Sequence, residues 1–554
     1  MSKKQIGGYP DPQASREEKL EKSYGVDYFK RMYGEWSNEE SGDGTHSSRN
    51  QRYNKCREYS SGMQSVEPYK ELLGATGDSS YLNLNWEIVP IIPKFVDVIV
   101  GGLTNQEYKI KCTSIDKVSQ DKRSKDKLEL LTKMHSKKFI DEIAELSGLP
   151  LNTGFEDLPE DKEELELYMQ LKYKQAVEIA MEEGIELTFY LNDWEEIKKR
   201  VLRDIIDINF GGTKTSVEDG QLRIRYVDPS NLITSHSTSP DFKNIQHAGE
   251  VTYMTIQELK KLAGDAFTTD EYDEIGRNNL GKFGNVKSVG SSRDLYNGHD
   301  TNMYDTFKIA VLDGVFKSTD SLHYEKKSNK FGGHSINKKS TGYKAPKKSK
   351  YKREQIKTHV ENIYKGSWIV GTDSIFGYGL ATNILRPKSN LSRAILPYSL
   401  YSPNMRNMNS KGLVERMIPF ADQIQLCHLK LQHLMSKAKP KGSAIELGAI
   451  ENVGKGDGGT FTPIEVQDIY QQTGNLYYRA QSDDGSPTQV NPIQELGGGI
   501  GGALQEIIAI YQYNMQMIRD VTGINEVRDA SAPDKESLVG VNKMALLASN
   551  NATR

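Results

Sequence analysis

Residues 412–439 read GLVERMIPFADQIQLCHLKLQHLMSKAK. Apolar side chains recur there in alternating steps of four and three residues, at Leu413, Met417, Phe420, Ile424, Cys427, Leu431, Leu434 and Ala438. This heptad spacing predicts one long helix with an apolar seam, which Pro440 ends. The seam leaves two interpretations open, because such a helix can be buried in the core of its own domain or packed between helices or subunits.

A second long helix is expected over residues 503–521, where five apolar residues are spaced to share one face: Leu504, Ile508, Tyr511, Met515 and Ile518. The sequence GGGIGG precedes it, with glycines at Gly497, Gly498, Gly499, Gly501 and Gly502. Glycine reaches backbone angles that other residues avoid, so this run predicts a hinge. Residues 538–548 also have a helical pattern.

The rest of the chain mixes helices with a few strands. Helices are expected over residues 16–33, between Pro93 and residue 102, over 160–183 and 194–208, with Gly184 separating the last two, and near 255–262. A change to period two predicts a hairpin over 213–226, and further strands are expected at 307–316, 358–364 and 368–370. Residues 264–304 have a loop-like composition. The predicted fold class is α+β, mostly helical with a small β-containing module.

The net charge of this 554-residue chain is only −3, but the charge is unevenly distributed. Residues 322–357 hold eleven lysines and Arg353 against Glu325 and Glu354, a net charge of +10. The remainder therefore carries −13. The basic segment is expected to be a mobile loop between two strands that contacts a polyanion or an acidic partner. A solvated loop without a partner is the alternative.

No catalytic centre can be assigned from the sequence. Residues 448–456 resemble a phosphate-binding loop, but the glycine spacing is too long and Gly456 replaces the hydroxyl residue that would hold magnesium. The glycines of 497–502 satisfy GxGxxG without the buried strand that a dinucleotide site requires. No HExxH, CxxC, GxSxG or kinase motif occurs. The sequence therefore predicts no enzyme activity, no cofactor and no metal site.

Location follows from what the sequence lacks. The three cysteines are too few and too dispersed for a disulfide framework, so reduced thiols are expected. The polar N-terminus does not resemble a signal peptide, and the most apolar early stretch falls short of a membrane span. These features predict a soluble protein made in the cytoplasm that makes no membrane contact.

The order of elements resembles that of the portal proteins of tailed bacteriophages, of the short-tailed type or of the crAss-like group. Four stretches carry the resemblance. They are 86–116 with YKIK at 108–111; the helical pair followed by LRIRYVDP at 222–229; 396–442 from LPY through GLVE to KAKPKG; and 505–524 ending in VTGI. Together they cover about half of the chain, and none is specific alone.

The resemblance implies a ring of about twelve copies at one capsid vertex, a head-tail connector through which double-stranded DNA is packaged and ejected. The implied parts are an N-terminal arm (1–80), a wing (81–304), a clip (305–400) with the lysine-rich loop, a stem helix (401–442), a wing return with a tunnel loop (443–502) and tunnel or crown-leading helices (503–554). The implied partners are double-stranded DNA, the major capsid protein, the terminase motor and head-tail adaptor or tail proteins. The implied location is the virion, after assembly in the host cytoplasm.

Three groups of residues become candidate sites on this basis. Partner or DNA contacts are expected at Lys338, Lys339, Lys347, Lys348, Lys350, Lys352 and Arg353. The five glycines of 497–502 would hinge the tunnel loop, and Met417, Phe420, Ile424, Leu431 and Leu434 would pack the stem helix. Two other classes remain open: a non-catalytic binding or scaffolding protein that uses the basic loop, and a phage nucleic-acid-processing enzyme.

Overall fold

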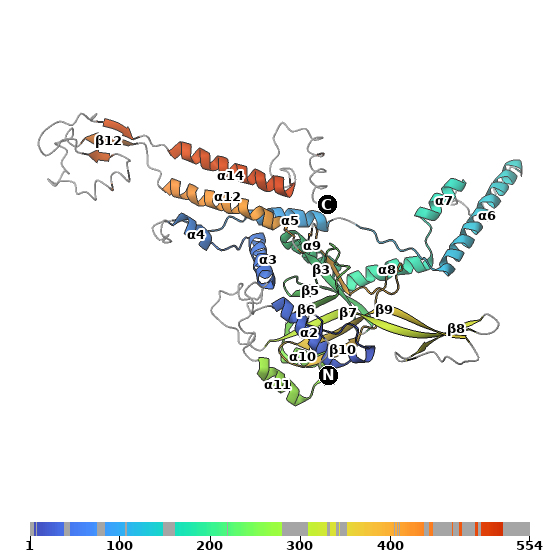
Figure 1. Ribbon diagram of the computed structural model, residues 1–554. Coiled ribbons are helices and arrows are strands. Elements are labelled where there is room, and N and C mark those ends of the chain that lie inside the picture. The colour runs from blue at the N-terminus through green and yellow to red at the C-terminus, as the bar shows by residue number, and fades with distance from the viewer. Residues whose placement is uncertain are drawn as a thin grey trace. The chain divides into compact units, whose positions relative to one another are not determined.

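The computed structural model describes residues 5–524 except 7, 38–44, 75–83, 106–107, 148–160, 219, 280–307, 329–332, 340–342, 344–351, 404, 407, 409, 437–441, 447–467, 469–471, 473–475, 479–492 and 497–499, and beyond 524 only residue 544. Helices and mainly antiparallel sheets make up the described chain (Figure 1), which confirms the predicted α+β class. The chain divides into two compact units. Unit 1 comprises residues 1–103, 202–212 and 227–554, and unit 2 comprises 104–201 and 213–226.

An antiparallel sheet forms the centre of unit 1. Its strands follow the order β10 (Ile375–Leu380), β9 (Lys352–Ile369), β7 (Ile309–Ser328), β6 (His247–Met254) and β5 (Leu232–Thr234), and β8 (His334–Lys339) pairs with the end of β7. Successive side chains of a strand point to opposite faces. Ala310 and Leu312 accordingly join one buried cluster, and Ile309 and Val311 join another. The base of the sheet is therefore buried on both faces.

Helices cover the two faces of this sheet. On one face lies α2 (Lys22–Ser37), whose Phe29 and Met32 are 0% exposed. Glycines on three strands make room for it, and a Cβ atom added to Gly314 would lie 2.5 Å from a ring carbon of Phe29. The other face is covered by α10 (Ile256–Ala263) and α11 (Thr269–Asn279), with the short 3₁₀ helix η1 (Gly264–Ala266) between them. The glycines of the sheet thus determine where α2 can pack.

The N-terminal segment is held to the sheet by a buried ion pair. Strands β1 (Gln5–Ile6) and β2 (Tyr9–Pro10) lead to α1 (Arg16–Lys19), whose first turn is closed by a capping box between Ser15 and Glu18. The Nζ atom of Lys19 donates to the carbonyl of Thr319 at 2.8 Å and lies 3.3 Å from Oδ1 of Asp320. Both charged side chains are at most 1% exposed.

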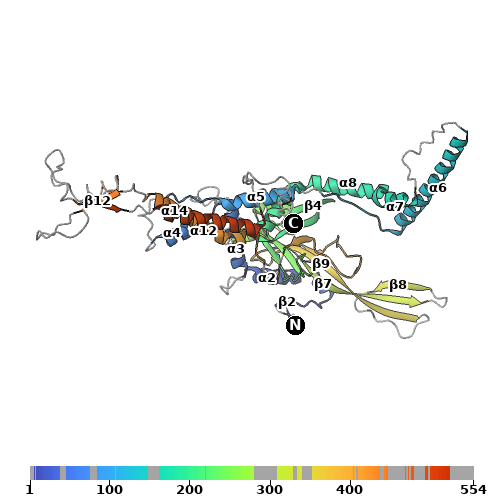
Figure 2. The same ribbon diagram turned by 90° about the horizontal axis from the view of Figure 1, so that it is seen from above.

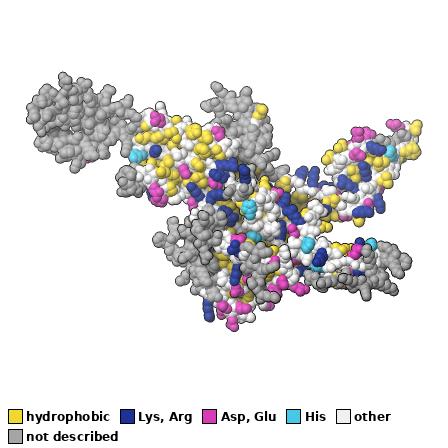
Figure 3. Space-filling model, viewed as in Figure 1, with side chains coloured by type: hydrophobic (Ala, Val, Ile, Leu, Met, Phe, Trp, Pro, Cys, Tyr) yellow, Lys and Arg dark blue, Asp and Glu magenta, His cyan; other side chains and the backbone are white. Residues whose placement is uncertain are grey.

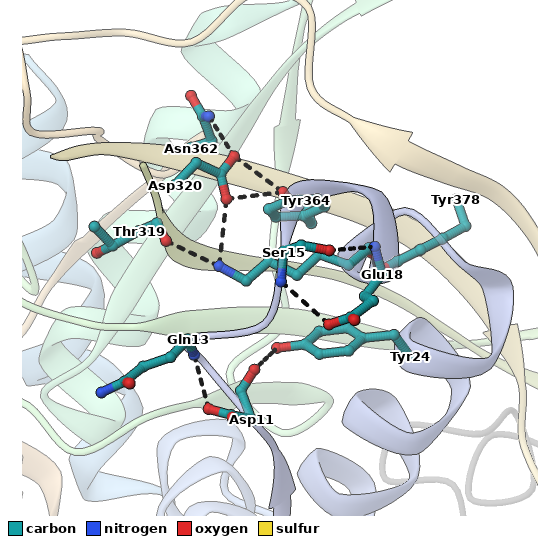
Figure 4. A network of polar contacts seen from close by, with 11 residues as sticks. Asp11, Gln13, Ser15, Glu18, Tyr24, Thr319, Asp320, Asn362, Tyr364 and Tyr378 are labelled. Atoms are coloured by element: carbon teal, nitrogen blue, oxygen red, sulfur yellow. Dashed lines mark hydrogen bonds and ion pairs between the residues drawn. The ribbon is translucent and has the colours of Figure 1, made fainter. Parts of the chain in front are cut away.

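Further hydrogen bonds complete this network (Figure 4). Asn362 donates to Oδ2 of Asp320 at 2.6 Å, and the Tyr364 hydroxyl lies 3.0 Å from the same oxygen. The hydroxyl of Tyr378 donates to the carbonyl of Lys19 at 2.6 Å. Burial, together with the nearby Asp320 carboxylate, raises the pKa of Tyr364, so its hydroxyl stays protonated and can donate. Every charge in this network is therefore paired or hydrogen-bonded.

A second core in unit 1 gathers segments that are distant in sequence. It includes residues of α3 (Thr45–Ser61), α5 (Ile91–Thr104), the end of α9 (Trp194–Ile208), β11 (Tyr398–Tyr401), α12 (Leu413–Ser436) and α14 (Ile500–Thr522). Helix α4 (Glu67–Leu73) follows α3. Between α12 and α14 lies a small sheet in the order β13 (Leu476–Tyr478), β12 (Gly442–Glu446), β14 (Ile493–Leu496).

Unit 2 consists of helices and one hairpin. The helices are α6 (Lys117–Ser147), α7 (Lys162–Leu171), α8 (Ala176–Leu191) and the first part of α9. The predicted hairpin is confirmed as β3 (Gly211–Glu218) and β4 (Gln221–Tyr226). Asn192 joins α8 to β4, since its amide donates to the carbonyl of Leu222 at 3.1 Å and its side-chain oxygen accepts from the amide of Ile224 at 3.1 Å.

Several local predictions were wrong. The helix expected over 160–183 is broken at 172–175, and Gly184 lies inside α8. Residues expected as loop after 264 instead form η1 and α11. The lysine-rich segment is partly ordered strand, because β7 extends to Ser328, β8 lies inside the segment and β9 begins at Lys352. Helices α3 and α6 were not predicted, and residues 538–548, apart from 544, lie outside the described residues.

Candidate interaction surfaces

Helices α12 and α14 pack side by side as an antiparallel pair (Figures 1 and 2). Strand β12 directly follows α12, strand β14 directly precedes α14, and these two strands pair with each other. The two helix ends are therefore joined through one small sheet, while their opposite ends reach the buried core that holds Val414 and Ile518. In Figure 3, hydrophobic side chains gather over this pair.

The residues predicted to pack the stem helix differ in how deeply they are buried. Met417 and Ile424 are 0% exposed and belong to the core cluster, and Phe420 packs against that cluster while staying partly exposed. Leu431 and Leu434 are half-buried. Within the described chain, the first part of the seam is thus a core of unit 1 itself. On α14, Ile518 is fully buried, whereas Ile508, towards the other end of the helix, is 45% exposed.

Buried polar groups fix α12 against neighbouring segments. Asp422 accepts hydrogen bonds of 2.6 Å from the hydroxyls of both Tyr59 and Tyr69. The side chain of Gln425 is 2% exposed, accepts from the amide of Val89 at 2.9 Å and donates to the carbonyl of Glu87 at 2.9 Å. Burial, reinforced by the hydrogen bond to Asp422, raises the pKa of Tyr59 to about 12. These contacts hold the helix in a fixed rotation about its axis.

The predicted glycine hinge is only partly described. Gly501 and Gly502 lie in the first turn of α14 and not in the segment before it, and a hinge at these glycines stays a prediction. Neither has a neighbour that would obstruct an added Cβ atom. Gly497, Gly498 and Gly499 lie outside the described residues, as do 448–456.

A three-stranded basic arm extends from the central sheet. It consists of the end of β7, all of β8 and the start of β9, in register from His323 opposite Lys339 and Lys357 to Ser328 opposite His334 and Lys352. At about 3.3 Å per residue, the 20 residues of β7 span about 65 Å. The arm therefore carries its lysines well beyond the buried base of the sheet.

Glu325 lies at the centre of the arm and forms ion pairs with two of its basic side chains. Its carboxylate is 3.0 Å from Nη1 of Arg353 and 3.3 Å from Nζ of Lys339, and it also accepts a hydrogen bond from the Tyr343 hydroxyl. The Tyr343 hydrogen bond and the two cations hold the pKa of Glu325 below its usual range. In the sequence, Glu325 is one of only two acidic residues in a lysine-rich segment. In the structure, its carboxylate links side chains of β7, β8 and β9.

The predicted contact residues whose side chains are described therefore separate into two kinds. Lys339 and Arg353 are engaged with Glu325, so they have a structural role in the arm. Lys338 is exposed on β8 and is available to a partner. Lys352 starts β9, and nothing is described of its side chain, while Lys347, Lys348 and Lys350 lie outside the described residues.

Comparison with models of known protein families gives no match, and comparison with curated proteins gives none either. The geometry of this chain is thus the basis of any functional argument. Among the described residues, no helix is both long and apolar enough to cross a membrane. In the same part of the chain, no three His, Cys, Asp or Glu side chains group as metal ligands would.

Proposed function

We propose that this chain is the portal protein of a tailed bacteriophage, a non-enzymatic ring of about twelve copies through which double-stranded DNA enters and leaves the capsid. The observation that carries the proposal is the α12–α14 pair. Two antiparallel helices of 24 and 23 residues are fixed to a buried core at one end and joined by a small sheet at the other. A ring of such pairs would enclose a channel with a helical wall.

The charge of the helix pair suits a channel for DNA. Over its 24 residues α12 carries Glu415, Arg416, Asp422 and Lys430, and over its 23 residues α14 carries Glu506, Arg519 and Asp520. Each cation that pairs with a phosphate adds affinity, so a basic wall would hold DNA in place. A wall with few and balanced charges would let the DNA slide.

The helix pair also changes how the parts of the proposed portal are assigned. The sequence suggested one stem helix over 401–442, whereas the packing of α14 on α12 makes both helices part of the proposed stem. The basic arm of β7, β8 and β9 is the proposed docking element for an acidic surface of the packaging motor or an adaptor protein, with DNA as the second choice. The proposal also implies the partners of the protein, namely the capsid shell, the packaging motor and the tail, and it implies a location in the virion.

The ring is the direct test. Purified full-length protein is expected to form closed rings of about twelve subunits in negative-stain images, with a matching native mass. The physical reason is that a channel requires a closed assembly. A protein that remains monomeric under all conditions would contradict the portal proposal and favour a binding or scaffolding role. Nuclease or NTPase activity would favour a nucleic-acid-processing enzyme.

Removing lysine charges from the basic segment should weaken its docking. We expect the variant Lys338→Gln, Lys347→Gln, Lys348→Gln, Lys350→Gln to bind a polyglutamate peptide at least about fourfold more weakly in fluorescence anisotropy, since each of four solvent-exposed ion pairs would contribute about 0.2–1 kcal/mol. Lys339 and Arg353 are left unchanged because they hold Glu325. Gln replacement of three exposed lysines on α9 and α10, Lys199, Lys260 and Lys261, is the control. Equal affinity of the two variants would contradict docking by the arm, and a stronger loss for duplex DNA would identify DNA as its partner.

A further inference from the structure

The basic arm has two different sides. Residues that are directly opposite in a sheet point to the same side, and successive residues of a strand alternate between the two sides. The register therefore places Glu325 and Gln355 on one side of the arm. It places Tyr324, Lys338 and Ile356 on the other side.

Tyr343 packs over the side that carries Glu325, which we call the covered side. Its hydroxyl donates to Glu325, and its carbonyl accepts from the side-chain amide of Gln355 at 2.8 Å. The Nζ atom of Lys339 lies 5.3 Å from the centre of the Tyr343 ring. His323 and Glu325 are accordingly only 7% and 3% exposed. This side of the arm is thus packed within the chain.

The other side, which we call the open side, carries an apolar patch. Tyr324 of β7 is directly opposite Ile356 of β9, and Ile336 of β8 lies diagonally across from Tyr324. Ile336 is 61% exposed, Ile356 is 37% exposed and Tyr324 is partly exposed. The Cβ atoms of such cross-strand neighbours lie about 4.5–8 Å apart, so the three side chains form one patch.

The open side continues the face of the central sheet that α2 covers. At the base of the sheet, Phe316 of β7 packs edge-on against Phe29 of α2. Four residues further along β7, the buried Lys19 covers Asp320. Tyr324 follows after another four residues, beyond the end of α2 (Figure 2). Within the described chain this helical cover thus stops before it reaches the patch.

Lysines border the apolar patch. Lys338 is exposed and directly opposite Tyr324, and Lys326 is directly opposite Ile336. The segment that contains the arm, residues 322–357, has a net charge of +10, which favours an acidic partner. A partner with acidic groups alone would leave the isoleucines in water, however. The complementary surface therefore combines apolar side chains with acids at their edge.

We infer that the open side of the arm binds an acidic amphipathic helix of another protein. The apolar side of that helix would cover the patch, as α2 covers the same face of the sheet at its base. Its flanking carboxylates would pair with Lys338. The inference rests on the proposed function, because docking by the arm is part of that proposal. It specifies which side of the arm makes the contact and adds an apolar contribution to it.

Two variants of the full-length protein test this contact. The patch variant carries Ile336→Thr and Ile356→Thr, which keep the β-branched side chains that suit a strand. The control carries Val217→Thr and Leu222→Thr, because these residues are directly opposite in the β3–β4 hairpin and are 49% and 45% exposed. Circular dichroism first compares both variants with the wild type. If the patch variant loses strand signal, Ile336→Thr alone takes its place.

Fluorescence anisotropy then measures the binding of two labelled peptides. One is a helical peptide of leucine, alanine and glutamate with all its leucines on one side, and the other is a scrambled peptide of the same composition. We expect the wild type and the control to bind the amphipathic peptide at least about fivefold more tightly than the scrambled one, because covering the patch removes apolar surface from water. The patch variant should lose this difference and bind the scrambled peptide as the wild type does.

The remaining outcomes separate the inference from the proposed function. A patch variant that keeps the full preference for the amphipathic peptide would overturn the inference and leave docking by charge intact. A wild-type protein that binds neither peptide would overturn both the inference and docking by the arm, whereas the ring is tested separately by imaging and native mass. Tighter binding of duplex DNA than of either peptide would overturn an acidic protein as the partner of the open side.

Discussion

Replacing Lys19 with methionine is expected to lower the free energy of unfolding by about 3–5 kcal/mol, because the change leaves the carboxylate of Asp320 buried without its cation. Methionine is chosen because it fills a similar volume. Asp320 would keep the hydrogen bonds from Asn362 and Tyr364, which cannot replace a full charge. Urea denaturation followed by fluorescence measures the change. A loss of this size should also release α1 from the sheet, which faster proteolysis near Ser15 would report.

The control for this prediction is Lys22→Met, because Lys22 lies at the exposed start of α2 and should change stability by less than about 0.5 kcal/mol. The double variant Lys19→Met with Asp320→Asn tests the cause. Removing both charges should recover much of the lost stability, since a neutral buried pair has less desolvation to compensate. Equal stability of Lys19→Met and the wild type would show that the pair does not hold the N-terminal segment.

Local spacing of apolar residues was enough to predict some elements of this fold. Helix α12 and the β3–β4 hairpin were predicted because the spacing of apolar residues along one short stretch of sequence is enough to indicate a helix or a hairpin. Helix α6 was missed because its apolar residues are sparse among lysines and acids. Helix α6 also leaves several apolar side chains exposed, because few of its residues pack against a core.

The parts of the candidate site that depend on distant contacts could not be read from the sequence. Lys19 stands in the polar turn REEK, and its partner Asp320 is 301 positions away. Glu325 appeared as a stray acid in a lysine-rich loop, and only the register of β7 with β8 and β9 brings Lys339 and Arg353 to it. Lysine composition identified the arm but could not separate the two cations that build it from those that remain exposed.

Substituting Ile424 with asparagine is expected to cost about 4 kcal/mol of unfolding free energy. Ile424 is 0% exposed in the core cluster that also holds Ile518 of α14. The substitution removes most of a buried aliphatic side chain and places an amide where it has no designed partner. Thermal and urea denaturation of the purified variant measure the loss, and the helix pair is expected to separate before the central sheet unfolds.

Leu431→Asn is the matched comparison, because the same seam and the same substitution are used where the side chain is only half-buried. We expect a loss of about 1–2 kcal/mol in the isolated chain. A larger effect at Leu431 than at Ile424 would contradict the packing described for unit 1. If Leu431→Asn instead leaves the stability of the chain unchanged while rings fail to form in negative-stain images, the exposed edge of Leu431 is a contact between subunits. The seam would then serve both alternatives that its sequence left open, a core within one chain at its start and an interface at its end.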